Sequence, residues 1–258
     1  MVKEENGIMQ TKHKGADMAI FAANFKCNLT RAQTKAYIEG LESYVSRTQS
    51  VGKREVFVFP NQAALLENTY DFVRVGAQNA HCVENGGFTG EIGAQQLREF
   101  GIDSILIGHS ERRTIFGESQ EYIAQKFAYF AKAGFRIIYC IGEDLAVRQN
   151  GSVEEFLRSE FRGIDTKYEN LIVAYEPIWA IGTGVSASLE DIEHTHKFLR
   201  SFLDVPLLYG GSVNETNAGE ILCLANVDGV LVGSASLELT RFCEIIDSKA
   251  TSDTAESK

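Results

Sequence analysis

The feature of this chain that most restricts its fold is the regular alternation of eight apolar runs with segments of helical patterning. Several runs are apolar throughout, which is typical of strands buried on both faces of a parallel sheet. We expect strands at residues 19–25, 55–59, 74–78, 104–108, 136–141, 171–175, 207–209 and 229–232. Eight strand–helix units predict an α/β protein built as a single (β/α)8 barrel, a fold of typically about 250 residues.

The segments between the runs favour helices. Thr30 and Ser188 are residue types that cap helix N-termini. We expect helices at residues 31–46, 62–68, 95–100, 119–133, 152–161, 188–202, 215–224 and 235–246. The barrel is assigned to residues 18–247, with a polar N-terminal extension at 1–17 and a disordered tail at 248–258. A doubly wound open sheet is the alternative, although the turn at 24–28 lacks the glycines usual there.

Composition excludes several classes of partner. A formal net charge of −10 argues against nucleic acid and anionic membranes. No apolar run approaches the roughly 20 residues needed to span a bilayer. The five cysteines are scattered and odd in number, which indicates reduced thiols in the cytoplasm rather than a disulfide or zinc framework. We expect no metal site, and we interpret four histidines as structural or surface residues: His13, His81, His194 and His196.

A single carboxylate follows the sixth apolar run. Glu176 comes directly after residues 171–175, and Pro177 and a glycine-punctuated loop follow it. Burying a charge is costly unless the charge is paired or used in chemistry. The glycine-rich loop has the composition of a mobile lid. The pattern therefore predicts a general base beneath a flap, and the alternative is a structural carboxylate paired with an arginine.

Other polar residues stand at the carboxyl ends of the predicted strands, where (β/α)8 barrels carry their chemistry. Asn24 and Lys26 end the first strand, and His109 follows the fourth. Two Gly/Ser turns, at 210–212 and 233–234, follow the seventh and eighth strands, where this fold often binds phosphate. We expect one end of the barrel to gather these groups around an anionic ligand.

Five motifs resemble those of the triosephosphate isomerase family, in that family's order, between about residues 19 and 246. They are Asn24-Phe-Lys26, Ile107-Gly-His-Ser-Glu-Arg-Arg113, Cys140-Ile-Gly-Glu143, Ala174-Tyr-Glu-Pro-Ile-Trp-Ala-Ile-Gly-Thr-Gly184 and Tyr209-Gly-Gly-Ser-Val213. The resemblance implies interconversion of dihydroxyacetone phosphate and D-glyceraldehyde 3-phosphate through an enediolate, in glycolysis and gluconeogenesis. It implies no metal and no organic cofactor.

The resemblance also assigns roles. Glu176 would be the base, His109 the electrophile at the carbonyl oxygen, and Lys26 would stabilise negative charge. Asn24 would donate a hydrogen bond to the substrate, and Glu111 would pair with Lys26. Trp179 would lie in the N-terminal hinge of the lid. The phosphate would be held by main-chain N–H groups of Gly182, Ser212, Gly233 and Ser234.

The segment 79–91 is long for a loop between a strand and a helix. Its end resembles the family's interdigitating loop, which implies a homodimer with Thr89 reaching Asn24 of the partner subunit. Glu91 could pair with Arg112 across the same contact. The alternative is an unconstrained surface loop.

Some residues depart from the family pattern. Phe25 and Cys27 stand where the family more often has Trp and Met, and Ser234 replaces the second of two glycines. The rival functions are a sugar-phosphate aldolase using Lys26 as a Schiff-base nucleophile and a non-catalytic phosphate-binding protein.

Overall fold

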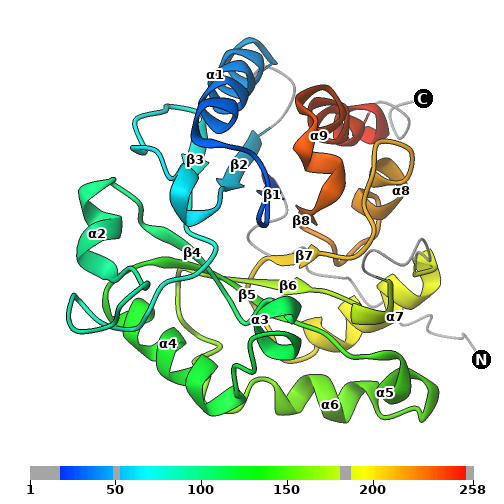
Figure 1. Cartoon of the computed structure of the whole chain (residues 1–258). Helices are drawn as coiled ribbons and strands as arrows, with labels where there is room; N and C mark the ends of the chain where they lie inside the picture. Colours follow the sequence, from blue (N-terminus) through cyan, green and yellow to red (C-terminus); the bar gives the residue numbers. More distant parts are fainter. Residues whose placement is uncertain (1–17, 49–52, 181–186, 254–258) are drawn as a thin grey trace, which may run out of the picture.

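The computed structural model describes residues 18–48, 53–180 and 187–253, and in these ranges eight parallel strands lie inside a layer of helices (Figure 1). The strands are β1 (Met18–Asn24), β2 (Lys53–Phe59), β3 (Val73–Val75), β4 (Ser104–Ile107), β5 (Arg136–Ile141), β6 (Leu171–Tyr175), β7 (Leu207–Tyr209) and β8 (Gly229–Val232). The α-helices are α1 (Arg31–Thr48), α2 (Ala94–Glu99), α3 (Ser110–Thr114), α4 (Gln120–Lys132), α5 (Leu145–Gln149), α6 (Val153–Ser159), α7 (Leu189–Arg200), α8 (Ala218–Leu222) and α9 (Leu239–Asp253). The 3-10 helices are η1 (Gln62–Ala64), η2 (Ile178–Ala180) and η3 (Ser234–Leu237).

The strands form a nearly closed barrel in the order β3-β2-β1-β8-β7-β6-β5-β4. Ala77 closes the gap between β3 and β4: its N–H donates to Ser104 O, its carbonyl accepts from Leu106 N–H, and both bonds are 2.9 Å long. The predicted (β/α)8 barrel is thereby confirmed, and the open doubly wound sheet is wrong.

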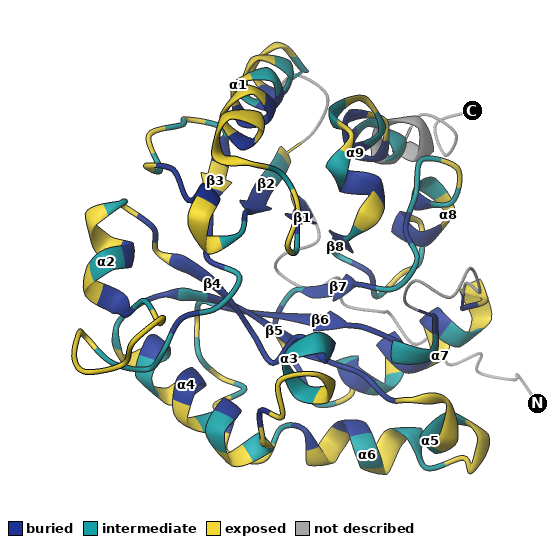
Figure 2. Cartoon of the chain, in the orientation of Figure 1, coloured by how far each residue is buried: buried dark blue, intermediate teal, exposed yellow. Residues whose placement is uncertain are grey.

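Two apolar layers explain why the strands are apolar throughout. Alternate residues of each strand face opposite sides. In β1, Phe21 and Ala23 pack beneath the helices, whereas Ile20 and Ala22 belong to a separate cluster that spans seven of the eight strands. That cluster also contains Phe57, Phe59, Leu106, Ile138, Cys140, Ile172, Ala174, Leu208 and Leu231. Figure 2 shows the strands mostly buried, with β3 partly exposed, and the outer helix faces exposed. The interior is therefore filled with side chains, and only the ends of the barrel can hold a ligand.

Some elements differ from the expected ones. Only residues 62–64 of the predicted helix at 62–68 are helical, as η1. The predicted helix at 235–246 is divided into η3 and α9 because Glu238 is extended, with φ −106° and ψ 117°. α5 was not predicted. The helix α9 continues to Asp253, beyond residue 247 where we expected the barrel to end. The extension at 1–17 and residues 254–258 lie outside the described residues.

Candidate active site

One cavity of about 380 Å³ lies at the carboxyl ends of the strands and brings together most of the predicted site residues. Its lining includes Asn24, Lys26, His109, Glu176, Ser212, Gly233 and Ser234. Glu111 lines an adjoining cavity that shares Asn24, Lys26 and His109 with the first. Thr89 is exposed on its loop, and Gly182 lies outside the described residues.

Glu176 is buried beside His109. The carboxylate Oε1 lies 3.2 Å from His109 Nε2, and Oε2 accepts a 3.2 Å hydrogen bond from the Ser110 N–H. A Cβ at Gly210 would lie 2.9 Å from Glu176 Cγ, so this glycine leaves room for the acid. Among the described residues, the side chain that pairs with the Glu176 carboxylate is this histidine rather than an arginine. The geometry therefore favours the prediction of a base over that of a structural ion pair.

His109 is the N-cap of α3, and this position orients its ring. Its Nδ1 accepts a 3.2 Å hydrogen bond from the Glu111 N–H at the start of the helix. An accepting Nδ1 carries no proton, so the ring proton lies on Nε2, the atom that faces Glu176. The imidazole can therefore donate a hydrogen bond into the cavity.

Lys26 has a left-handed backbone, with φ 50°, which is rare for a residue with a side chain. Such a conformation costs on the order of 1–3 kcal/mol and persists only when its surroundings fix it. Asn24 Oδ1 accepts from the Lys26 N–H at 3.0 Å, and Gln78 Nε2 donates to Lys26 O at 2.8 Å. The Lys26 Nζ lies 2.6 Å from Glu111 Oε1. The backbone and the ammonium group are thus both held in place.

The turns after β7 and β8 form the other side of the cavity. A Cβ at Gly233 would lie only 3.7 Å from Lys26 Cε, so this turn lies directly against the lysine side chain. Ser212 Oγ donates to Ala180 O at 2.7 Å, which links the β7 turn to η2. An anion in this half of the cavity would lie near an ammonium group and main-chain N–H groups, the combination that suits a phosphate.

Glu143 is fully buried beneath η2, and sequence reasoning predicted no role for it. Its Oε1 accepts hydrogen bonds from Trp179 Nε1 at 2.9 Å and from the Tyr175 hydroxyl at 3.0 Å. Burial raises the pKa of Tyr175, and the neighbouring Glu143 carboxylate raises it further. The phenol therefore keeps its proton and remains a donor. Glu143 joins the last turn before residue 181 to strands β5 and β6.

Sequence reasoning missed Ser110 and Gln78 as well. The main-chain N–H of Ser110 donates to the Glu176 carboxylate. The Gln78 side chain donates to the carbonyl of Lys26, although the two residues are 52 positions apart in the sequence. Both stand close to strand ends, but their contacts depend on which groups approach them in three dimensions, and the sequence does not specify those approaches.

The loop at 79–91 has a defined shape, although residues 84–91 are exposed. His81 Nδ1 lies 2.8 Å from the Tyr122 hydroxyl, and the His81 and Phe88 ring centroids are 4.2 Å apart. Arg112 pairs with Glu118 of its own chain at 2.6 Å, and the pairing of Glu91 with Arg112 across a subunit contact stays a prediction. The second cavity, of about 440 Å³, lies next to Lys26 and is also lined by Glu91, Arg112 and Phe116.

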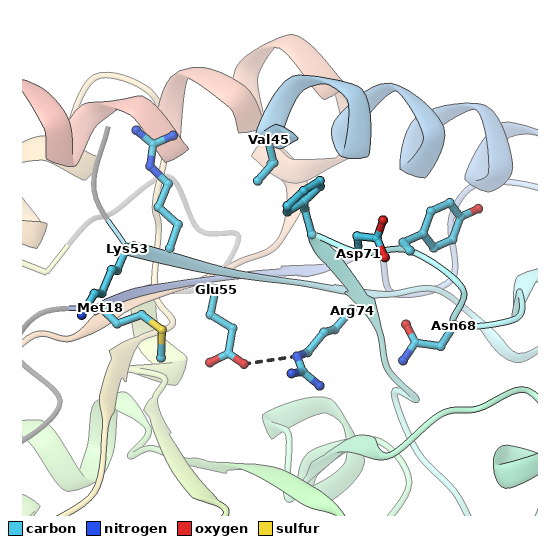
Figure 3. Close-up of a pocket in the computed structure, with 10 residues that line it drawn as sticks. Met18, Val45, Lys53, Glu55, Asn68, Asp71 and Arg74 are labelled. Carbon is cyan, nitrogen blue, oxygen red and sulfur yellow. Dashed lines mark ion pairs between the residues drawn. The ribbon is translucent and has the colours of Figure 1, made fainter. Parts of the chain in front are cut away.

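A larger cavity, of about 750 Å³, lies at the opposite end of the barrel (Figure 3). Met18 and Lys53 at the starts of β1 and β2 line it, together with Glu55 and Arg74, whose Oε1 and Nε atoms are 3.3 Å apart. Its position at the amino ends of the strands is not where barrels of this type carry their chemistry.

Within the described ranges, no three His, Cys, Asp or Glu side chains are arranged to hold a metal ion. The helices described by the structure include none that is long and apolar enough to cross a membrane.

Comparison with known proteins agrees with this site. The family model of triosephosphate isomerase matches residues 19–249. The triosephosphate isomerase of Helicobacter hepaticus is 55% identical over 231 residues, which are 89% of this chain and 98% of that protein. The enzyme of the same name from a Sulfurovum species is 57% identical over 229 residues, 88% of this chain and 99% of that protein. The chain therefore belongs to the triosephosphate isomerase family.

Proposed function

We propose that this chain is a triosephosphate isomerase that interconverts dihydroxyacetone phosphate and D-glyceraldehyde 3-phosphate, a step of glycolysis and gluconeogenesis. The observation that carries the proposal is the meeting of Glu176, His109 and Lys26 at one cavity that also has two Gly/Ser turns. A proton can be moved between two carbons of a phosphorylated triose by a base, a hydrogen-bond donor at the carbonyl oxygen and a cation near the phosphate, and these three side chains supply those groups.

Glu176 would remove a carbon-bound proton from dihydroxyacetone phosphate. The electron pair left on that carbon forms the C–C double bond of the enediolate, and the carbonyl oxygen takes the negative charge. His109 Nε2–H would donate to that oxygen and pass a proton between the two enediolate oxygens, so that the former carbonyl oxygen gains a proton and the hydroxyl on the first carbon loses one. The protonated Glu176 would then return its proton to the former carbonyl carbon, which leaves an aldehyde on the first carbon. The 3.2 Å separation of Nε2 and Oε1 supports this assignment because both groups reach the same small volume.

Lys26 would bind the anionic substrate. Its Nζ is held 2.6 Å from Glu111 Oε1, and its side chain lies against the β8 turn in the cavity that Glu176 and His109 also line. The main-chain N–H groups of Ser212, Gly233, Ser234 and Gly182 would hold the phosphate, and closure of the segment after Trp179 would exclude water from the enediolate.

The test is a coupled assay of triose phosphate interconversion with purified protein, with and without a chelator. We expect chelator-insensitive turnover that falls on the order of 10³-fold or more in Glu176→Gln, with an inert phosphorylated analogue still bound. Turnover of Glu176→Gln at the wild-type rate would contradict the assignment of the base. Covalent trapping of substrate on Lys26 by borohydride would instead support the aldolase.

We further propose a homodimer formed through the loop at 79–91, with Thr89 reaching Asn24 of the partner subunit. Supporting observations are the exposed apolar side chains Phe88, Ile115 and Phe116, which are 45%, 70% and 64% exposed. The cavity of about 440 Å³ next to Lys26 is a socket of suitable position for such a loop.

Light scattering on Phe88→Glu tests the dimer. We expect mostly monomer and reduced kcat, because each site would lose the partner's loop. Leu145→Glu, at an exposed leucine on α5, is the matched control and should stay dimeric. A Phe88→Glu dimer with unchanged kcat would argue against this interface.

A cytoplasmic location is proposed from the scattered, unpaired cysteines, and cell fractionation would test it.

A further inference from the structure

An ion pair close to the active site bonds to backbone groups at the ends of β4 and β5, the strand end that carries His109 and the one that contacts Glu176. Arg113 lies on α3, and Glu160 is the C-cap residue of α6. Arg113 Nη1 and Glu160 Oε1 are 3.3 Å apart, and their side chains are only 14% and 7% exposed. Neither residue lines the cavity of Glu176.

Glu160 reaches the catalytic acid through one peptide group. Its Oε2 accepts a 2.8 Å hydrogen bond from the Gly142 N–H. The carbonyl of that same peptide, Ile141 O, accepts a 2.7 Å bond from the Glu176 N–H. A Cβ at Gly142 would lie 1.7 Å from Glu176 O, so the two backbones are in direct contact. A displacement of Gly142 must therefore move Glu176.

Arg113 reaches the histidine in the same way. Its Nε donates to Gly108 O at 2.7 Å, in the peptide directly before His109. Its Nη2 donates to Cys140 O at 3.1 Å, which ties the end of β4 to β5. Through these bonds, one guanidinium and one carboxylate connect the peptides before His109 and beside Glu176.

We propose that Arg113 and Glu160 are positioning residues that fix the separation of His109 and Glu176, an inference that rests on the proposed function of those two residues. A charged acceptor polarises the peptide it binds and strengthens the hydrogen bond at its far end. Loss of the Glu160 charge would therefore loosen the Glu176 backbone without touching the phosphate turns. Burial raises the pKa of Glu160 to about 7, so its assay belongs at about pH 8, where the carboxyl is ionised.

The test compares Glu160→Gln and Glu160→Ala with the wild type. Gln keeps an oxygen for the Gly142 N–H but loses the charge, and Ala loses both. We expect kcat to fall about 10-fold for Gln and about 100-fold for Ala, because small displacements of reacting groups have large effects on rate. KM should stay within about twofold. The imidazole nitrogen NMR signals of His109 should shift in both variants.

The matched control is Asp228→Asn at the opposite end of the barrel. Asp228 Oδ2 also pairs with an arginine, Arg200 Nη2 at 2.6 Å, and also accepts a main-chain N–H, that of Leu207 at 2.7 Å. This variant should lose thermal stability as the Glu160 variants do, but keep kcat at temperatures well below its Tm.

Wild-type kcat in both Glu160 variants, with a drop in Tm like that of Asp228→Asn, would overturn the inference and leave only a structural role. If Glu160→Ala does not fold, Glu160→Gln decides. A wild-type protein without isomerase activity would instead contradict the proposed function. An active wild type with an inactive Glu176→Gln and neutral Glu160 variants would contradict this inference alone.

Discussion

Lys26 shows how a single residue is held in an unfavourable conformation where it is needed. Its left-handed backbone is fixed by Asn24 on one side and by Gln78 on the other. Gln78 Nε2 also donates to Phe59 O at 2.8 Å, so one amide joins the ends of β1 and β2. The strain thus lies next to the ammonium group that would bind the substrate.

Gln78→Ala should reduce kcat/KM about 10-fold and lower the free energy of unfolding by about 1–2 kcal/mol, because the Lys26 carbonyl loses its Gln78 donor and Phe59 O keeps only the Phe25 N–H. Steady-state kinetics and urea unfolding measure the two effects. Gln125→Ala, on the exposed face of α4, should change neither. Unchanged kcat/KM in Gln78→Ala would mean that Lys26 keeps its position without this amide.

Residue type and position in the chain were sufficient to identify Glu176, His109 and Lys26 as candidates. Each is a chemically versatile side chain at the end of an apolar run, and such runs end at the same face of the barrel. Ser110, Glu143 and Glu160 could not be identified in this way. Their roles depend on which backbone groups approach them in three dimensions, and nothing local in the sequence specifies those contacts.

At the scale of elements, the eight apolar strands were predictable, whereas the short helix α5 was not predicted and η1 is shorter than the helix expected at 62–68. The strands could be recognised in the sequence because both of their faces are buried, so nearly all of their residues are apolar. α5 has five residues and no buried side chain, and the Asp144 cap, bonded to the Val147 N–H at 2.9 Å, holds its first turn. Helices this short depend on caps and tertiary contacts rather than on propensity. This dependence on caps and tertiary contacts also explains why η1 is shorter than the helix predicted at 62–68.

The contact between α3, α4 and the loop at 79–91 contains a buried charge cluster. Lys126 Nζ lies 2.5 Å from Glu118 Oε1 and 2.6 Å from Asn79 Oδ1, and Arg112 binds the same carboxylate. Glu118→Ala should lower the free energy of unfolding by about 3–5 kcal/mol, because Lys126 would be buried without a counter-charge.

Calorimetry of that variant beside Glu84→Ala tests this prediction. Glu84 pairs with Arg98 on the surface, where such pairs contribute only about 0–1 kcal/mol. Equal losses in the two variants would contradict the account of the buried cluster.

α7 carries a buried histidine that makes stability depend on pH. Burial lowers the pKa of His196 from 6.5 to about 4, so the folded protein keeps the imidazole neutral. The unfolded chain binds that proton below about pH 6.5, so the contribution of this group is present above pH 6.5 and is lost as the pH falls to about 4. The loss is on the order of 3 kcal/mol.

The free energy of unfolding of His196→Gln, measured with urea at several pH values between 4 and 7, should therefore change less with pH than that of the wild type. His194→Gln is the control, because that ring is exposed. If the unfolding free energies of the wild type and of His196→Gln change equally with pH, this imidazole does not cause the pH dependence.

At the scale of the whole molecule, the barrel separates stability from chemistry. Its interior is filled, its amino end holds ion pairs such as Arg200 with Asp228, and its carboxyl end gathers the site residues.

Trp179 is the only tryptophan, and its indole N–H donates a hydrogen bond to Glu143 just before residue 181. Saturation with an inert phosphorylated analogue should therefore change its fluorescence, and an unchanged spectrum would argue against closure of the lid.

The central claim is that Glu176 removes a carbon-bound proton from a triose phosphate. Conversion of dihydroxyacetone phosphate in heavy water, followed by proton NMR, tests it most directly. The account predicts that the wild type introduces carbon-bound deuterium into substrate and product, and that a folded, analogue-binding Glu176→Gln variant does not. Deuterium incorporation by Glu176→Gln at the wild-type rate would contradict the account.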